Sequence, residues 1–166
     1  VDEAVLAPVA RAYRAVLPAP VREGIGNVLG NAGDVWAAAN HLLQGKPKAA
    51  ADTGMRVGVN TVFGLLGVLD VATELGLERQ SEDFGQTLGR WGLGSGPYLM
   101  LPLLGPSSVR DGAGLVVDRQ FDISQLASHE RDSYAVTALE VVHKRAGLLS
   151  AGQLLGQIAL DRYTFV

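Results

Sequence analysis

The residues between Arg90 and Arg110 constrain the fold more than any other part of the chain. This stretch of nineteen residues, WGLGSGPYLMLPLLGPSSV, carries no formal charge, and a membrane-spanning helix needs about 20 apolar residues. It is interrupted by four glycines and three prolines: Gly92, Gly94, Gly96, Gly105, Pro97, Pro102 and Pro106. Glycine loosens a helix and proline removes a backbone donor, and lipid leaves such an irregular backbone without hydrogen-bond partners. The stretch therefore predicts a loop or hairpin that is shielded by other protein or lines a cavity.

The composition excludes several classes of protein. The 166 residues fit a single domain covering 1–166, and only 19% of them are charged, against ~25% in ordinary soluble domains. The mean hydropathy is +0.19, and the net charge of −3 argues against a nucleic-acid partner. Because the chain contains no cysteine, disulfides, thiol chemistry and a cysteine-type zinc site are excluded.

Apolar residues recur at helical spacing along most of the chain, so we expect an all-α fold. Helix-capping residues are expected at Asp34, Asp70, Ser81, Ser108 and Ser150. The expected helices cover residues 2–16, 21–29, 35–44, 48–69, 71–75, 82–88, 109–117, 132–146 and 151–160. Strand-like alternation is confined to residues 98–104, which gives a compact helical domain with an irregular apolar hairpin near 91–109.

A second uncharged stretch lies at residues 57–69. Its thirteen residues are too few to span a membrane, for which the minimum is about 17, so we expect a buried or re-entrant helix. Gly54 and Gly58 form a small-xxx-small pair that would let another helix approach closely. They are equally compatible with glycines that are simply tolerated in a helix.

No motif for catalysis or metal binding is present. The three histidines are far apart in sequence and lack the spacing of metal ligands. The stretch GLGSGP resembles a nucleotide-binding loop, but no strand precedes it and Pro97 occupies the position where a helix should offer free N–H groups. Ser95 lacks the context of a serine nucleophile, and Glu82 and Asp83 fit a solvated face. We expect no catalytic residue, no metal and no cofactor.

Several motifs resemble the MlaA (VacJ) family of outer-membrane phospholipid-transport lipoproteins. The most specific lie between Phe84 and Asp111, and weaker ones cover essentially the whole chain. The matching runs are DFGQTLG at 83–89, WG at 91–92, GPY at 96–98, LP at 101–102, GPSS at 105–108, RD at 110–111, PVA at 8–10, LQG at 43–45, NT at 60–61, DVA at 70–72 and D-x-Y at 161–163.

The sequence departs from the family at both ends. The lipoprotein signal, the acylated cysteine and the segment that follows it in the family are absent from this chain, and so is the basic, aromatic C-terminal tail. Val57 also stands where the family commonly has an aromatic residue. We interpret the missing ends as truncation, so membrane anchoring is implied by the resemblance alone.

The resemblance implies a ring-like helical protein in the inner, periplasmic leaflet of the outer membrane of a Gram-negative bacterium. Such a protein removes phospholipid mislocalised to the outer leaflet and passes it, without ATP, to the periplasmic lipid carrier MlaC. It is embedded in the membrane and associates with a trimeric outer-membrane porin. Exposing about 30 methylenes to water at ~0.8 kcal/mol each costs roughly 20–25 kcal/mol, which an amphipathic passage avoids without any enzymatic chemistry.

From this resemblance we assign the expected site residues and their roles. The wall of the lipid passage is a mobile hairpin, sheltered within the ring, of Tyr98, Leu99, Leu101, Pro102, Leu103 and Leu104. The hinges of the hairpin are Gly94, Gly96 and Gly105. A polar collar consists of Arg90, Arg110 and Asp111, although Arg110 and Asp111 also fit a simple helix-start pair at the water boundary.

Two other functions stay open at this point. The protein could be a structural partner of porin with no lipid path of its own. It could also be a soluble lipid hydrolase, against which the absence of a nucleophile motif argues.

Overall fold

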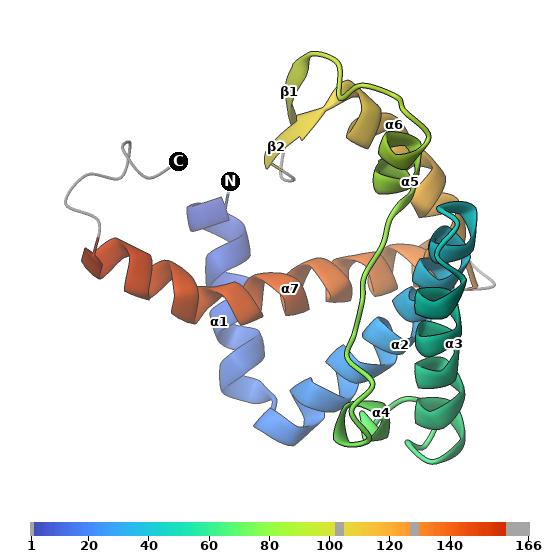
Figure 1. The fold of residues 1–166 in the computed structure, drawn as a ribbon. Helices are drawn as coiled ribbons and strands as arrows, with labels where there is room; N and C mark the ends of the chain where they lie inside the picture. The colour runs from blue at the N-terminus through green and yellow to red at the C-terminus, as the bar shows by residue number, and fades with distance from the viewer. Residues whose placement is uncertain (1, 102–104, 127–129, 159–166) are drawn as a thin grey trace.

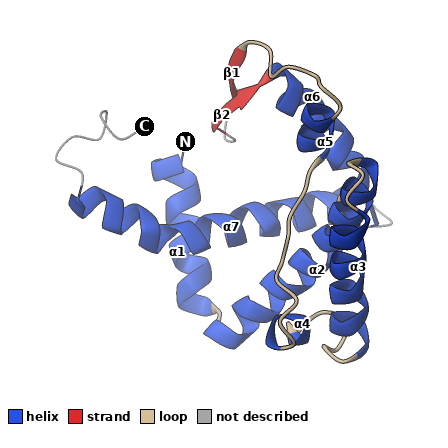
Figure 2. Cartoon of the chain, viewed as in Figure 1, coloured by secondary structure: helices blue, strands red, loops and turns tan. Residues whose placement is uncertain are grey.

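The protein is all-α apart from one two-stranded hairpin, as expected (Figures 1 and 2). The computed structural model describes residues 2–101, 105–126 and 130–158. In chain order the described elements are η1 (Asp2–Leu6), α1 (Ala7–Val16), α2 (Ala19–Leu43), α3 (Pro47–Val62), α4 (Val71–Glu74), α5 (Phe84–Arg90), β1 (Tyr98–Leu101), β2 (Gly105–Ser108), α6 (Val109–Asp118), η2 (Arg119–Phe121), η3 (Ile123–Leu126) and α7 (Glu130–Ile158).

The helices close a ring of contacts. α2 and α3 pack side by side, α1 crosses α7, and the segment between α4 and α5 runs along the molecule to the hairpin end (Figure 1). From α7 the contacts lead through η3 and η2 to α6, then to α5, and return through α2 to α7. This circuit matches the ring-like arrangement that the family resemblance implies.

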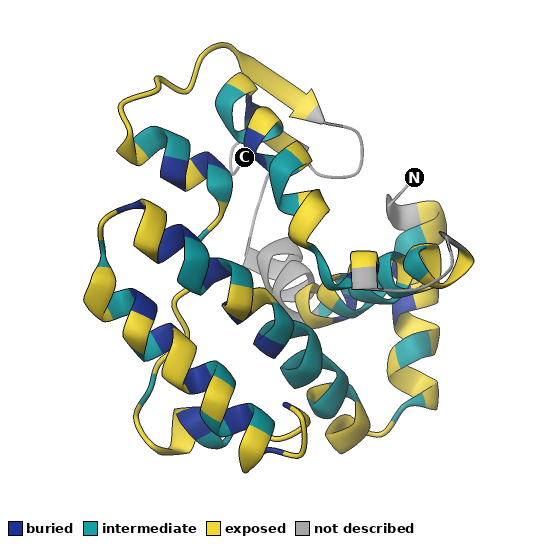
Figure 3. Ribbon diagram, turned by 90° about the vertical axis from the view of Figure 1, so that its right-hand side faces the viewer, coloured by how far each residue is buried: buried dark blue, intermediate teal, exposed yellow. Residues whose placement is uncertain are grey.

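The distribution of polar and apolar side chains is reversed from that of an ordinary soluble domain. The buried positions are scattered along the helices (Figure 3). The largest fully buried side chains are all polar: Arg56, His41, Asn40, Asn60, Thr53, Thr87 and Asp34. Among the residues whose burial the structure describes, the buried apolar ones are all alanines, whereas many large apolar side chains are exposed. Large apolar residues normally fill a core, so this chain places its apolar material on the outside.

Two predicted helix boundaries inside long helices are wrong. α2 runs unbroken from Ala19 to Leu43, so Asp34 does not cap a helix. It is instead buried in the middle of α2, where Arg56 and Arg79 donate to its carboxylate. α7 likewise continues through Ser150, where we expected a capping box to start a new helix. Neither proline nor a left-handed glycine interrupts the described part of α7, so the helical hydrogen bonds of the backbone continue through Ser150.

The second uncharged stretch is only partly helical. α3 begins at Pro47, one residue before the predicted start, but ends at Val62, well before the predicted end at residue 69. The chain then turns through three residues with positive φ, namely Leu65 at 53°, Leu66 at 59° and Gly67 at 91°. A side chain at Gly64 would collide with the carbonyl oxygens of Asn60 and Leu69. Only glycine therefore fits this tight turn, and the helix ends where the turn begins.

Gly54 and Gly58 do not mediate close helix packing. In the described part of the chain no atom lies within 4 Å of the position that a Cβ would take at either glycine. The hypothesis of a small-residue contact is therefore wrong, and the alternative of tolerated helix glycines holds.

The short helices confirm two of three predicted caps. The side chain of Asp70 accepts a hydrogen bond from the Thr73 backbone at 3.2 Å, and Ser108 accepts one from the Asp111 backbone at 3.1 Å. The cap predicted at Ser81 is wrong: the carboxylate of Asp83 accepts from the Gln86 backbone at 2.7 Å, and α5 starts at Phe84. The carboxylate at 83 is closer to the free N–H groups of this helix and takes the capping role.

Candidate functional site

A buried polar cluster supports the junction of α2, α3 and α4. The guanidinium of Arg56, with 0% of its side chain exposed, donates to both oxygens of Asp70 at 3.0 and 3.1 Å and to Asp34 at 3.5 Å. It also donates to Thr73 and to the carbonyl of Leu77. Every charge in this cluster faces an opposite charge, as a buried ion needs.

The pKa of Asp70, an acid of this cluster, lies well below its usual value. Burial raises the pKa, but hydrogen bonds from Thr73 and Asn60 and the charge of Arg56 outweigh this effect and lower it to about 2. Asp70 is therefore ionised at neutral pH and holds α4 against α3.

A second polar cluster joins the end of α2 to the start of α5. Glu82 accepts from Lys46 at 2.8 Å and from Gln44 at 2.9 Å, and Gln44 also donates to Thr87 at 3.1 Å. Burial raises the pKa of Glu82, but the hydrogen bonds from Lys46 and Gln44 prevail and hold it below its usual value. The prediction that Glu82 lies on a solvated face is wrong, because only 11% of its side chain is exposed and it accepts from both donors.

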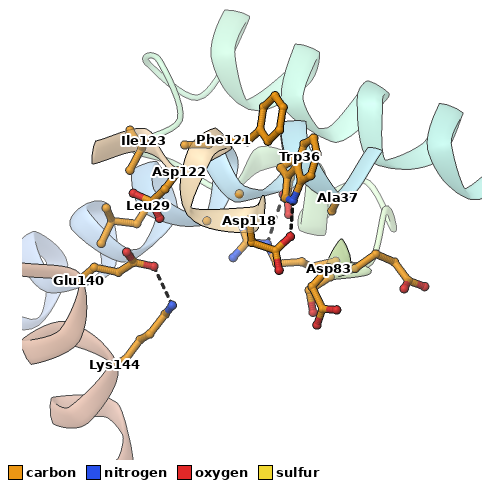
Figure 4. A pocket seen from close by; sticks show the side chains of 18 of the residues that line it. Leu29, Trp36, Ala37, Asp83, Asp118, Phe121, Asp122, Ile123, Glu140 and Lys144 are labelled. Carbon is orange, nitrogen blue, oxygen red and sulfur yellow. Dashed lines mark hydrogen bonds and ion pairs between the residues drawn. The ribbon is translucent and has the colours of Figure 1, made fainter. Parts of the chain in front are cut away.

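The centre of the ring holds a pocket of about 410 Å³ (Figure 4). Apolar side chains from α2 and the short helices form one part of its wall: Leu29, Trp36, Ala37, Phe121 and Ile123. Charged side chains form another part: Asp34, Arg79, Glu82, Asp83, Asp118, Asp122, Glu140 and Lys144. The pocket thus offers apolar and charged surface side by side, and acidic groups outnumber basic ones.

Aromatic stacking and one aspartate organise the apolar wall of this central pocket. The rings of Trp36 and Phe121 stack with centroids 4.0 Å apart and an interplanar angle of 7°. Asp118, at the end of α6, accepts from the Trp36 indole at 2.7 Å and from the Phe84 backbone at 2.9 Å. α6 therefore connects the hairpin to the pocket: the first residue of α6 follows the hairpin, and its last residue, Asp118, contacts the pocket wall.

A second hollow of about 380 Å³ adjoins the central pocket and shares Gly26, Arg79 and His143 with it. It lies between α1, α2 and α7 and is also lined by Tyr13, Arg22, Glu23 and Asn27. The Tyr13 hydroxyl and the Nδ1 of His143 are 3.0 Å apart. Burial lowers the pKa of His143, and the charges of Arg22 and Lys144 lower it further.

The predicted hairpin exists, but it is not sheltered within the chain. β1 and β2 pair antiparallel with Tyr98 opposite Ser108 and Leu101 opposite Gly105. Residues 91–100 are all exposed, so the shelter expected inside the ring is wrong for this part. Pro102, Leu103 and Leu104 lie outside the described residues.

The strand ends are tied to the start of α6. The Val109 backbone donates to the carbonyl of Pro97 and the Arg110 backbone to that of Ser95, both at 3.2 Å. Of the predicted hinges, Gly96 has a positive φ of 71°, a conformation that favours glycine. Gly92, which we did not assign as a hinge, has a φ of 95°, while the roles of Gly94 and Gly105 stay predictions.

The structure brings together two of the three collar residues. Arg110 Nη2 and Asp111 Oδ1 are 2.7 Å apart. The hydrogen bond from Arg110, followed by that of Ser108, lowers the pKa of Asp111. Arg90 is exposed at the end of α5. The pair fits both a collar and a helix-start arrangement, so its role stays a prediction.

Sequence reasoning missed the buried ionic cluster of Asp34, Arg56, Asp70 and Arg79. The available signal was a charged residue, Arg56, flanked by Met55 and Val57 in a helix that leads into an uncharged stretch. Such a position needs a buried partner or marks a function. His41 is also buried, with Nε2 at 3.3 Å from the Gln80 carbonyl. Within the described ranges no group of three potential ligands could hold a metal ion.

The fold and the pockets together define a class of protein. It is a ring of helices with polar clusters inside, a pocket of mixed polarity at its centre and large apolar side chains outside. Extensive exposed apolar surface marks contact with lipid or with another protein. None of the helices in the described ranges has the length and hydropathy to cross a membrane.

The chain belongs to the MlaA lipoprotein family, whose model matches residues 1–166. It is 34% identical to the intermembrane phospholipid transport system lipoprotein MlaA of Escherichia coli (strain K12) and to that of Shigella flexneri, in each case over 168 residues. These matches cover 99% of this chain and 66% of the relative, so the chain spans just under two thirds of the length of these curated relatives.

A solved structure supports the same assignment. It comes from work on the structural basis for maintenance of bacterial outer membrane lipid asymmetry, and it shares 33% identity with this chain. The two superpose with a TM-score of 0.80, and the match covers 98% of this chain and 82% of the other. The fold, including its ring of helices, is thus that of the family.

Proposed function

We propose that this protein transports phospholipid and thereby maintains the lipid asymmetry of the outer membrane. The observation that carries the proposal is the central pocket, where an apolar wall around the Trp36–Phe121 stack faces charged side chains. A phospholipid needs both kinds of surface, one for its acyl chains and one for its headgroup. The relatives' name, intermembrane phospholipid transport system lipoprotein, points to the same substrate.

The protein acts from within the outer membrane, in its inner leaflet. The turn after α3 supports this location, because it exposes Phe63, Leu65 and Leu66 while its backbone is internally paired. The N–H groups of residues 66, 67 and 69 donate to the carbonyls of residues 61, 60 and 64 at 3.1, 2.8 and 2.9 Å. Lipid accepts an irregular backbone only when such groups are satisfied.

Lipid movement is controlled by the hairpin of Tyr98, Leu99, Leu101, Pro102, Leu103 and Leu104, hinged at Gly94, Gly96 and Gly105. Its position supports this role: the hairpin leads directly into α6, whose last residue, Asp118, holds Trp36 in the pocket wall. Arg90, Arg110 and Asp111 form the polar collar where the apolar segment returns to water.

The transport step is not enzymatic and uses no ATP. The lipid passes to the periplasmic carrier MlaC, and a trimeric porin holds the protein in the membrane. The exposed apolar surface on several helices supports contact with both lipid and a membrane partner.

The test is a single charge placed in the hairpin of the full-length protein, Leu101→Asp or Leu103→Asp. We expect slower transfer of a labelled phospholipid from vesicles that contain the protein and porin to the carrier, with unchanged co-purification of porin. Ala51→Asp, which puts the same charge on a small exposed residue of α3, is the control and leaves transfer intact.

Each alternative function predicts a different result. Unchanged transfer in both hairpin variants, with porin still bound, would support a purely structural porin partner. Release of fatty acid from phospholipid by the purified wild-type protein would support a hydrolase. A disulfide that locks the hairpin to a neighbouring helix should also stop transfer, and normal transfer in the locked protein excludes gating.

A further inference from the structure

Two arginines, Arg22 and Arg79, are among the described residues that line the hollow between α1, α2 and α7. Each is anchored through its Nε: Arg22 donates to the Leu17 carbonyl at 3.1 Å and Arg79 to the Asp34 carboxylate at 3.2 Å. These are the hydrogen bonds that the two side chains make within the described part of the protein. Their Nη groups therefore keep their donors for a ligand, and a guanidinium presents such donors in a planar fork that matches a phosphate.

Glycines on α2 make room for this arrangement. The guanidinium of Arg79 lies against Gly30 so closely that a Cβ at this position would overlap it. A Cβ at Gly26 would lie 2.7 Å from the Nε2 of His143. Arg79 and His143 can therefore approach the helix backbone only because positions 26 and 30 lack side chains.

His143 contributes a third polar group to the hollow. Its Nδ1 faces the Tyr13 hydroxyl at 3.0 Å, which leaves Nε2 on the side of Gly26. When the hydroxyl donates to Nδ1, the neutral ring carries its proton on Nε2 and can donate to an acceptor in the hollow.

The charges of the two adjoining spaces decide where an anion would bind. The central pocket contains several carboxylates beyond Arg79, among them Asp118, Asp122 and Glu140, so it repels an anion. The hollow contains Arg22 and Arg79 against one carboxylate, Glu23. An anionic group that entered this connected space would be held at the arginine end, with the apolar wall of the central pocket next to it.

We propose that Arg22 and Arg79, together with the Nε2 of His143, bind the phosphodiester anion of a phospholipid headgroup. The proposal rests on the proposed transport function and adds the location of the headgroup to it. The recognised chemistry is an alkyl phosphate, which free phosphate shares, so binding experiments must separate these two sources.

The experiment measures binding of three probes to the full-length protein in detergent: a short-chain phosphatidylglycerol, the diacylglycerol with the same chains, and inorganic phosphate. Arg22→Gln should weaken phosphatidylglycerol binding by about tenfold, because a charge-assisted hydrogen bond is lost. Binding of the diacylglycerol, which has no phosphate, should not change. Arg131→Gln, at an exposed arginine of α7, is the matched control and should bind all three probes normally.

Glu23→Gln provides an independent test in the opposite direction. Removing the one carboxylate of the hollow should strengthen phosphatidylglycerol binding by about twofold to fivefold, an effect that damage to the fold cannot produce. Competition by inorganic phosphate at millimolar concentration would identify free phosphate as a ligand, whereas its failure to compete assigns the site to the lipid.

Two results would overturn the headgroup site. One is equal phosphatidylglycerol affinity in the wild type, Arg22→Gln and Glu23→Gln; the other is an equal loss of diacylglycerol binding in Arg22→Gln. If the wild type transfers phospholipid normally and the arginine variants bind it as tightly as the wild type does, only this site is refuted. A wild type that neither binds nor transfers phospholipid refutes the transport function itself.

Discussion

The two uncharged stretches of the chain, residues 57–69 and 91–109, have very different support. The first forms the end of α3 and a turn, and the buried cluster of Arg56, Asn60 and Asp70 lies directly beneath it. The second runs exposed from α5 to the hairpin and is tied to α6 by backbone hydrogen bonds at residues 95 and 97. The first stretch therefore lies against a buried polar cluster, whereas the second is held to α6 by backbone hydrogen bonds.

Under the proposed function the two stretches have different tasks. A turn that presents apolar side chains to lipid works best when its backbone is fixed, whereas a gate needs few tertiary contacts so that it can move. Weakening the support of each stretch separately tests this comparison.

The largest effect is expected from Arg56→Met, which removes the centre of the cluster under the first stretch. Asp34 and Asp70 would lose their buried partner, and breaking such a pair costs about 3–5 kcal/mol of unfolding free energy. Urea unfolding of the purified protein in detergent measures the loss. Lys48→Met, at a surface ion pair with Asp52, should leave stability unchanged. A similar small effect in both variants would show that the cluster does not support the turn.

The second prediction concerns the support of the hairpin, which depends on the close packing of α5 against α6. A Cβ at Gly114 would lie 2.5 Å from the backbone nitrogen of Gly85, so Gly114→Ala forces the two helices apart at a cost of up to about 3 kcal/mol. Gly112→Ala is the matched control, because no described atom lies within 4 Å of its Cβ position. The alanine there should stabilise α6 by up to ~1 kcal/mol. Equal stability of the two variants would refute the close contact.

The third prediction uses the pKa of Asp70. Because the folded-state pKa is about 2 and the usual value is 3.8, the ionised group stabilises the fold above pH ~4 by about 2 kcal/mol. This contribution is lost as the pH falls from about 4 towards 2. Asp70→Asn should therefore be less stable than the wild type at pH 7, and the difference should shrink towards pH 2. A difference that stays constant over this range would show that ionisation of Asp70 does not stabilise the turn.

The sequence predicted local structure well where one residue determines it. Asp70 and Ser108 cap their helices, and the alternation at residues 98–104 gives a hairpin. It failed at Asp34, where a residue with high capping preference is instead held by arginines distant in the chain. Such long-range pairing overrides local preference and leaves no periodic signal. For the same reason the central pocket, assembled from distant helices, could not be predicted.

The smallest effect on stability is expected from Leu66→Gly, and it should have opposite signs in two measurements. Leu66 has a φ of 59° and 76% exposure. A left-handed conformation costs a side-chain-bearing residue roughly 1–2 kcal/mol, part of which glycine recovers against its own entropy cost. We expect a net gain of ~0.5–1 kcal/mol in urea unfolding. Leu42→Gly, at an exposed position within α2, should instead lose about 1 kcal/mol.

Binding of Leu66→Gly to phospholipid vesicles should weaken despite this gain in stability, because the turn loses an apolar side chain that lipid would cover. A variant that is more stable and yet binds vesicles less well would show that the turn keeps a strained backbone in order to present its leucines to the membrane. If vesicle binding is unchanged while stability rises, the turn does not face lipid, and its rigidity must serve contact with a protein partner instead.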